Sequence, residues 1–131
     1  MLVLEMKSRN MIYFRPKKYG NKTCFVDGIR FDSRREADYY GQLKIEKRAK
    51  LILDFDRQVA FNLYGWRDDL RGGTFARVRV CSHIVDFLVE MPDGKKVVRE
   101  VKSYGTMTDV WKIKHKLFEV NYPEIPYEVI I

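Results

Sequence analysis

Apolar and polar side chains alternate most regularly over residues 75–91 (FARVRVCSHIVDFLVEM), a pattern typical of a β-strand. A second β-prone run, KVVREVKS, covers residues 96–103. Between the two runs lie Pro92, Asp93 and Gly94, residues that favour a turn because Pro fixes its backbone and Gly tolerates a positive φ. We therefore expect the two runs to pair as an antiparallel hairpin.

Two other segments repeat apolar residues at the intervals of a helix. The first, SRREADYYGQLKIEKRAK, begins at Ser33, and Glu36 three residues later forms a capping box for a helix of about four turns. The second covers residues 109–120, where lysines occupy the faces that the apolar residues leave. The apolar residues of this second amphipathic helix are Val110, Ile113, Leu117 and Val120.

Shorter β-prone runs complete the pattern. The segment CFVDGIRF contains Asp27-Gly28, a dipeptide that readily adopts the backbone angles of a tight hairpin turn. Residues 66–73 (WRDDLRGG) are charged and end in two glycines, which indicates an exposed loop. Further strands are expected at LILDF (51–55), QVAFNLY (58–64) and YEVII (127–131). The order of elements predicts an α/β fold with a central mixed β-sheet flanked by helices.

The charge of the chain suggests its partner. Its 131 residues fit one domain, and 25 Lys and Arg against 18 Asp and Glu give a net charge of +7. A basic surface favours nucleic acid, although anionic membranes and acidic proteins attract it too. Residues 15–22 (RPKKYGNK) concentrate positive charge beside Pro and Gly. We therefore divide the chain into a basic N-terminal arm, residues 1–22, and a single domain, residues 23–131.

The spacing of the cysteines and the length of the apolar segments indicate the cellular compartment of the protein. Cys24 and Cys81 lie far apart, without the spacing of a zinc site, which favours a reduced, cytoplasmic protein. The segment MLVLEMKSRN is too short in apolar residues for a signal peptide, and no segment reaches the ~18 apolar residues of a membrane span. We expect neither secretion nor a membrane partner.

Candidate chemistry lies on the two long strands. Alternation puts Glu100 and Lys102 on one face of their strand and puts Asp86 beside Ile84 and Leu88, where a carboxylate is normally disfavoured. The hairpin can bring Asp86 to Glu100 if it closes with one or two bulges, although the register stays open. Two facing carboxylates repel unless a hard cation lies between them, and Mg²⁺ or Mn²⁺ suits such oxygen ligands.

Asp86, thirteen intervening residues and Glu100-Val101-Lys102 resemble the Asp…Glu-x-Lys core of the PD-(D/E)XK nuclease superfamily, with Val85 where the superfamily name has proline. Over about residues 17–120 the chain resembles a phage and prophage family of small endonucleases within it, related to Holliday-junction resolvases. The residues that carry this second resemblance are Lys18-Tyr19-Gly20-Asn21-Lys22, Asp27-Gly28, Phe31-Asp32-Ser33, Glu36-Ala37-Asp38-Tyr39-Tyr40 and Gln58.

The resemblance implies a restriction-endonuclease-like fold and a site in which Asp86, Glu100, the Val101 carbonyl and Glu36 hold the metal. Lys102 would then position water and stabilise charge. Two simpler interpretations compete with this one. Glu100 and Lys102 could form a surface ion pair, and the capping box alone explains Glu36. The roles of Gln58 and His83 stay open.

The function implied is a Mg²⁺- or Mn²⁺-dependent DNA endonuclease, a junction resolvase that works as a homodimer on branched DNA such as a four-way junction. If the chain is phage-encoded, its compartment is the host cytoplasm. Two alternatives remain: a nuclease of nicking, flap or restriction type, and a basic DNA-binding module without catalysis. The candidate DNA-binding residues are Lys17, Lys18, Lys22, Arg34, Lys112 and Lys116.

Overall fold

The computed structural model describes residues 23–69 and 74–131. The chain falls into two compact units whose boundary lies between Asp38 and Tyr39, and each is described by itself. The predicted basic arm, residues 1–22, lies outside the described residues. Over the part of the chain that the structure describes, none of the helices has the length and apolar character needed to cross a membrane.

The first unit contains the predicted hairpin and the start of the first helix. Strands β1 (Cys24–Val26) and β2 (Ile29–Phe31) pair antiparallel, and Asp27 (φ 54°) and Gly28 (φ 75°) form the turn between them. Both positive φ values match a type I′ hairpin turn, as the Asp-Gly dipeptide predicts. Helix α1 (Arg34–Arg48) follows.

Ser33 caps helix α1. Its Oγ accepts a hydrogen bond from the backbone N–H of Glu36 at 3.1 Å, which satisfies a donor that has no partner within the helix. The predicted start of the helix is therefore confirmed, together with the Ser33 half of the capping box. The helix continues into the second unit.

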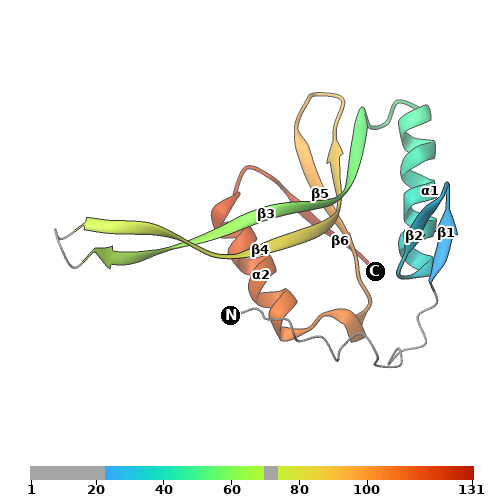
Figure 1. Ribbon diagram of the computed structural model, residues 1–131. Coiled ribbons are helices and arrows are strands. Elements are labelled where there is room, and N and C mark those ends of the chain that lie inside the picture. Colours follow the sequence, from blue (N-terminus) through green and yellow to red (C-terminus); the bar gives the residue numbers. More distant parts are fainter. Residues whose placement is uncertain (1–22, 70–73) are drawn as a thin grey trace. The chain divides into compact units, whose positions relative to one another are not determined.

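The second unit is built on a four-stranded mixed sheet (Figure 1). Its order is β3 (Asp54–Asp69), β4 (Thr74–Glu90), β5 (Lys96–Val101) and β6 (Tyr127–Ile130), with the first three antiparallel and β6 parallel to β5. The long strand, the hairpin after it and the last strand are confirmed. The two runs predicted before residue 66 form one strand, and the loop predicted over residues 66–73 is strand as far as Asp69, although Trp66 is exposed as expected. Residues 70–73 lie outside the described part of the chain.

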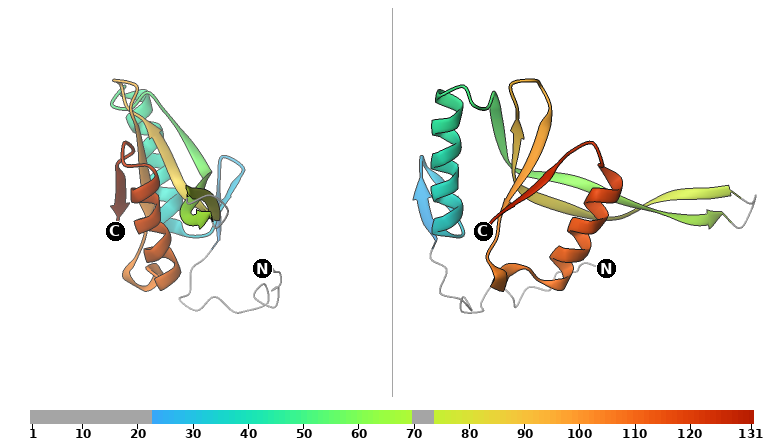
Figure 2. Two further views of the ribbon diagram at one scale, coloured as in Figure 1. Left: turned by 90° about the vertical axis from the view of Figure 1, so that its left-hand side faces the viewer. Right: turned by 180° about the vertical axis from the view of Figure 1, so that it is seen from behind.

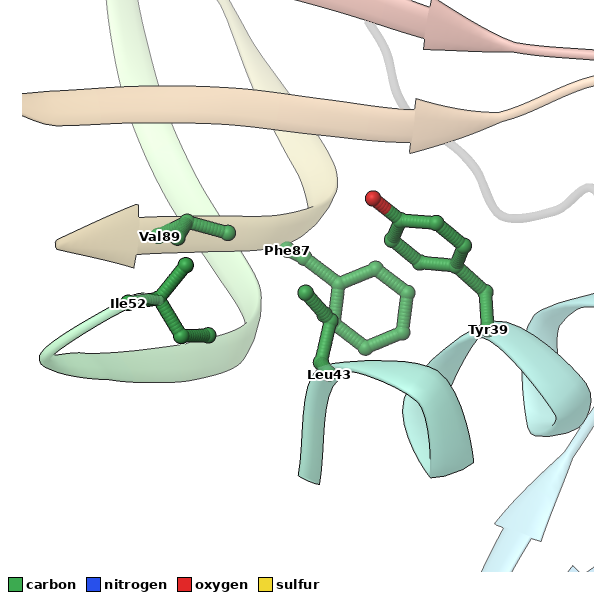
Figure 3. Close-up of a cluster of buried hydrophobic side chains, with 5 residues drawn as sticks. All are labelled: Tyr39, Leu43, Ile52, Phe87 and Val89. Carbon is green, nitrogen blue, oxygen red and sulfur yellow. The ribbon is translucent and has the colours of Figure 1, made fainter. Parts of the chain in front are cut away.

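Helices cover both faces of this sheet. Tyr39 and Leu43 of α1 pack against Phe87 and Val89 of β4 and against Ile52 (Figure 3). On the other face, Phe118 of α2 (Asp109–Asn121) packs with Leu63, Val85 and Val98. Figure 2 shows the two helices from two further sides. The expected mixed sheet with flanking helices is thus observed.

Helix α2 packs through a different face from the one predicted. Val110, Ile113 and Val120 are exposed, whereas Trp111 and Phe118 are buried. Aromatic residues bury more apolar surface than valine or isoleucine, and this larger gain decides the orientation of the helix. The apolar spacing predicted the helix, but of its four apolar residues only Leu117 packs against the buried cluster.

The side-chain alternation of β4 breaks at Asp86. Val85 and Phe87 have the same parity in the sequence, yet they belong to the two hydrophobic clusters on opposite faces of the sheet. On the paired strand β3, Gln58 has a positive φ of 51° at the same level, between the pairs Arg57–Phe87 and Val59–Val85. At Asp86, therefore, the alternation of side chains between the two faces of the sheet is reversed: residues of the same parity before and after Asp86 lie on opposite faces.

Candidate active site

Two carboxylates replace the backbone ladder at the point where β4 and β5 cease to pair. The last residue pair of the hairpin is Phe87 with Arg99. One residue further, the N–H of Asp86 donates to Glu100 Oε1 at 2.8 Å, and the N–H of Val101 donates to Asp86 Oδ2 at 2.9 Å. Asp86 and Glu100 thus meet as expected, and the register between the strands needs no bulge.

Glu100 is held by three donors in a buried position. Its side chain is only 3% exposed, and besides the N–H of Asp86 it accepts hydrogen bonds from Trp111 Nε1 (3.1 Å) and Tyr127 Oη (3.0 Å), both at Oε2. A buried carboxylate is stable only when donors replace the water it has lost. These donors come from β4, α2 and β6, so three elements fix the carboxylate in one orientation.

Tyr127 extends the network to His83. The Tyr127 hydroxyl has a single proton, which goes to Glu100, so His83 Nε2 at 2.8 Å must donate to the Tyr127 oxygen. Burial and the negative charge of Glu100 raise the pKa of Tyr127 well above its ordinary value. Burial also lowers the pKa of His83, against the opposing attraction of Glu100. Both rings are therefore neutral at pH 7, with the His83 proton on Nε2.

Lys102 approaches the site from the end of β5. Its backbone N–H donates to the carbonyl of Ile130 at 2.8 Å, and its Nζ lies 5.3 Å from the centroid of the Trp111 ring. The same indole donates its N–H to Glu100. Trp111 therefore contacts both charged residues of the predicted Glu-x-Lys pair, and an ammonium over an indole face is electrostatically favourable.

The donor set suits a hard cation in its chemistry. Asp86 and Glu100 contribute carboxylate oxygens, and Mg²⁺ is commonly held by one or two carboxylates with water in its remaining positions. Within residues 23–69 and 74–131, no group of three or more His, Cys, Asp or Glu side chains gathers in a form that could hold a metal. The two carboxylates would therefore have to be completed by water or carbonyl oxygen, such as that of Val101.

Other predicted site residues are placed separately. Glu36 belongs to the first unit, so its predicted role as a metal ligand stays a prediction. Gln58 is exposed at the level of Asp86 on the paired strand. Arg34 is exposed and forms an ion pair with Asp38 at 3.3 Å.

The predicted DNA contacts divide in the same way. Lys112 and Lys116 are exposed on α2, the helix that carries Trp111 to Glu100. Lys17, Lys18 and Lys22 lie outside the described residues.

Sequence reasoning missed the donors to Glu100. Trp111 and His83 are both buried, at 9% and 4% exposure. Neither was connected to Glu100, and Tyr127 was not singled out. The parallel pairing of Glu100 with Val129 places Tyr127 two residues away along the neighbouring strand, and no local sequence pattern indicates this pairing.

Comparison with known proteins gives a family without a described activity. A family model described as "Protein of unknown function (DUF1064)" matches residues 16–131. Neither the curated proteins nor the solved structures contain a match to the chain.

Proposed function

Because the chain belongs to the DUF1064 family, whose description assigns no activity, we propose its function from the site: a metal-dependent DNA endonuclease of the PD-(D/E)XK type. One observation carries the proposal. Asp86 and Glu100 exchange hydrogen bonds with each other's strands at the end of the β4–β5 hairpin, and Lys102 follows two residues later. Two carboxylates can hold the cation that assists phosphodiester hydrolysis, and an ammonium can stabilise the charge that develops.

Each residue has a distinct part in this proposal. Asp86 and Glu100 would hold Mg²⁺ or Mn²⁺, with the carbonyl of Val101 as a further ligand. The cation would supply Lewis acidity and a water of lowered pKa. Lys102 would stabilise the negative charge that develops on the phosphate, because its ammonium lies over the ring of Trp111, whose indole N–H donates to Glu100.

The charge of the protein favours DNA as the phosphodiester. The chain carries a net charge of +7, and Lys112 and Lys116 are exposed on the helix whose Trp111 contacts Glu100. Lysines at such positions neutralise phosphates and release counterions. Branched DNA as substrate, and a homodimer that makes two symmetric cuts, complete the proposal; both rest on the resemblance to junction resolvases.

The decisive experiment combines substrates, metals and one substitution. Pure protein is incubated with labelled four-way junction, flap, single strand and linear duplex, each with Mg²⁺, Mn²⁺, Ca²⁺ or chelator. Asp86→Asn keeps an acceptor for the N–H of Val101 but removes the charge that holds a cation, so cleavage should fall by orders of magnitude while DNA binding persists. Asp56→Asn, an exposed residue of β3, is the matched control.

Two results would contradict this function. Cleavage by Asp86→Asn at the wild-type rate would remove the carboxylate from catalysis. Equal cutting of linear duplex and junction by a protein that sediments as a monomer at micromolar concentration would leave a nuclease of another specificity, such as a nicking, flap or restriction enzyme.

A second candidate function is a basic DNA-binding module without catalysis. The observation that favours it is the hydrogen bonding of Glu100, whose two oxygens accept from three protein donors. This alternative predicts DNA binding at the same affinity with Ca²⁺, Mg²⁺ or chelator and no cleavage of any substrate in the panel.

A further inference from the structure

Strands β3 and β4 extend beyond the rest of the sheet as a two-stranded ribbon (Figures 1 and 2). Strand β5 pairs with β4 only over Phe87–Glu90. The pairing of β3 with β4 instead continues from Tyr64–Arg79 to Asp69–Thr74, beyond a register shift at Leu63 and Tyr64. An isolated two-stranded ribbon has little core of its own, so its side chains are available to a partner.

The register determines which side chains share a face of this ribbon. Residues directly opposite each other on antiparallel strands point to the same side, and so do alternate residues along a strand. Trp66 lies opposite Arg77, and Arg67 lies opposite Ala76 on the other side. One side, which we call the ribbon face, therefore carries Tyr64, Trp66, Asp68, Phe75, Arg77 and Arg79. The opposite side carries Gly65, Arg67, Ala76 and Val78.

Aromatic and guanidinium groups alternate on the ribbon face. Trp66 is 68% exposed and Phe75 is 71% exposed, so neither ring is packed in a hydrophobic core. The Arg77 guanidinium lies 3.7 Å from the centroid of the Tyr64 ring, and Arg79 Nε donates to Asn62 Oδ1 at 3.0 Å. The two arginines exceed the single acidic residue of this face, Asp68, so the face is positively charged.

We propose that the ribbon face binds unpaired nucleotides, with bases stacked on Trp66 and Phe75 and phosphates held by Arg77 and Arg79. Exposed aromatic rings offer a stacking surface that every base can use, and arginines follow the backbone. Duplex DNA hides the faces of its bases in its own stack, so these rings select strands that are already unpaired. This inference rests on the proposed function, since it names DNA with an unpaired segment at a branch as the substrate of the same protein.

Charge argues against a second copy of the chain on this face. A two-fold pairing of two ribbon faces would bring the arginines of one copy against those of the other, at a cost in like-charge repulsion. Nucleic acid, in contrast, neutralises them. The partner that complements both the rings and the charge is therefore a polyanion with exposed bases.

The test measures binding without cleavage, in the presence of chelator and with the full chain. Fluorescence anisotropy gives the Kd of a labelled single strand of twelve thymidines and of a blunt duplex of equal length. The double variant Trp66→Ala, Phe75→Ala should weaken single-strand binding at least about tenfold and duplex binding about twofold or less. Melting temperatures near that of the wild type show that the variants are folded.

A pair of arginine variants provides the matched control. Arg77→Ala and Arg67→Ala remove the same charge from the same ribbon, but from opposite faces. Arg77→Ala should weaken single-strand binding several-fold more than Arg67→Ala. Equal effects would show that only net charge matters and would overturn the proposal.

Other outcomes also decide the matter. Wild-type affinity of the double variant for the single strand would overturn the proposal, as would an equal loss for duplex and single strand. If instead the double variant turns a dimer into a monomer and each protomer binds DNA unchanged, the face is an interface between copies and the proposal is overturned. If the double variant binds the single strand and cleaves DNA as the wild type does, this inference alone is rejected. If the wild type binds single strands through the ribbon face but cleaves no substrate, the proposed function alone is rejected.

Discussion

Removing the Tyr127 hydroxyl gives the most direct measure of the network around Glu100. Tyr127→Phe keeps the ring, which packs against His115 with centroids 4.1 Å apart, and deletes only the oxygen. That oxygen donates to Glu100 Oε2 at 3.0 Å and accepts from His83 Nε2 at 2.8 Å. The substitution therefore breaks two hydrogen bonds among buried groups and changes little else.

The expected cost follows from these two bonds. A hydrogen bond to a charged group contributes about 1.5–3 kcal/mol, and a buried donor left without its acceptor costs about 1–3 kcal/mol. His83 can recover part of this by moving toward Glu100 Oε2, which now lies 3.8 Å from its Nε2. We therefore expect the free energy of unfolding to fall by about 3 kcal/mol, which corresponds to a melting temperature lower by on the order of 10 °C.

Urea unfolding measures this cost, and Tyr122→Phe is the control. Tyr122 Oη donates to the carbonyl of Asn62 at 2.7 Å, an exposed bond to a neutral acceptor. The same chemical change should cost about 1 kcal/mol or less there. Equal losses for Tyr127→Phe and Tyr122→Phe, at unchanged dependence on urea, would refute the view that the Glu100 network is stabilised by buried, charge-assisted bonds.

Two further substitutions test other ion pairs of the second unit. Arg99→Met removes a mostly buried guanidinium that forms hydrogen bonds with Tyr39, Glu46 and Glu128, and thermal unfolding should show a destabilisation of about 3 kcal/mol. An exposed ion pair contributes at most about 1 kcal/mol, so a loss of less than about 1 kcal/mol would show that Arg99 behaves like a surface ion pair. Asp54 accepts hydrogen bonds from Lys47 Nζ at 2.9 Å and from the N–H of Phe55, and both lower the pKa of its carboxyl group. The ionised Asp54 therefore stabilises the fold at neutral pH, and this stabilisation is lost as the pH falls through the lowered pKa. Lys47→Met should raise the Asp54 pKa in an NMR titration of its carboxyl carbon, and an unmoved titration would contradict the assignment.

Local signals predicted the elements where a single short-range interaction decides the structure. Asp27-Gly28 accepts positive φ at both positions, and the Ser33 hydroxyl satisfies a helix donor three residues away, so neither depends on the rest of the chain. The hairpin around Gly94 (φ 88°) is of the same kind. Its turn set the register that brings Asp86 beside Glu100.

Long-range competition decided what the sequence did not predict. The alternation argument assumes a regular strand, whereas the alternation of β3 and β4 is interrupted at Gln58 and Asp86. The apolar surroundings inferred for Asp86 were therefore wrong. Ile84 is exposed, and the Asp86 carboxylate accepts a hydrogen bond from the backbone N–H of Val101. Parallel pairing of β5 with β6 is another such case, because it joins segments separated by helix α2. No local sequence pattern predicts that the Tyr127 hydroxyl donates a hydrogen bond to Glu100.

The orientation of helix α2 links the error in packing to the chemistry of the site. Had Val110 and Ile113 faced the sheet, as their spacing suggests, the indole of Trp111 would point to solvent. Glu100 would then be buried with one donor fewer, and Lys102 would lose the ring beneath its ammonium. The loss of this donor and the exposure of the Trp111 ring would together offset the free energy that two aliphatic side chains gain by burial. The polar demand of Glu100 and the apolar gain of Trp111 and Phe118 therefore favour the same orientation, and the residue that makes the helix pack is also the one that holds the acidic and basic groups of the site together.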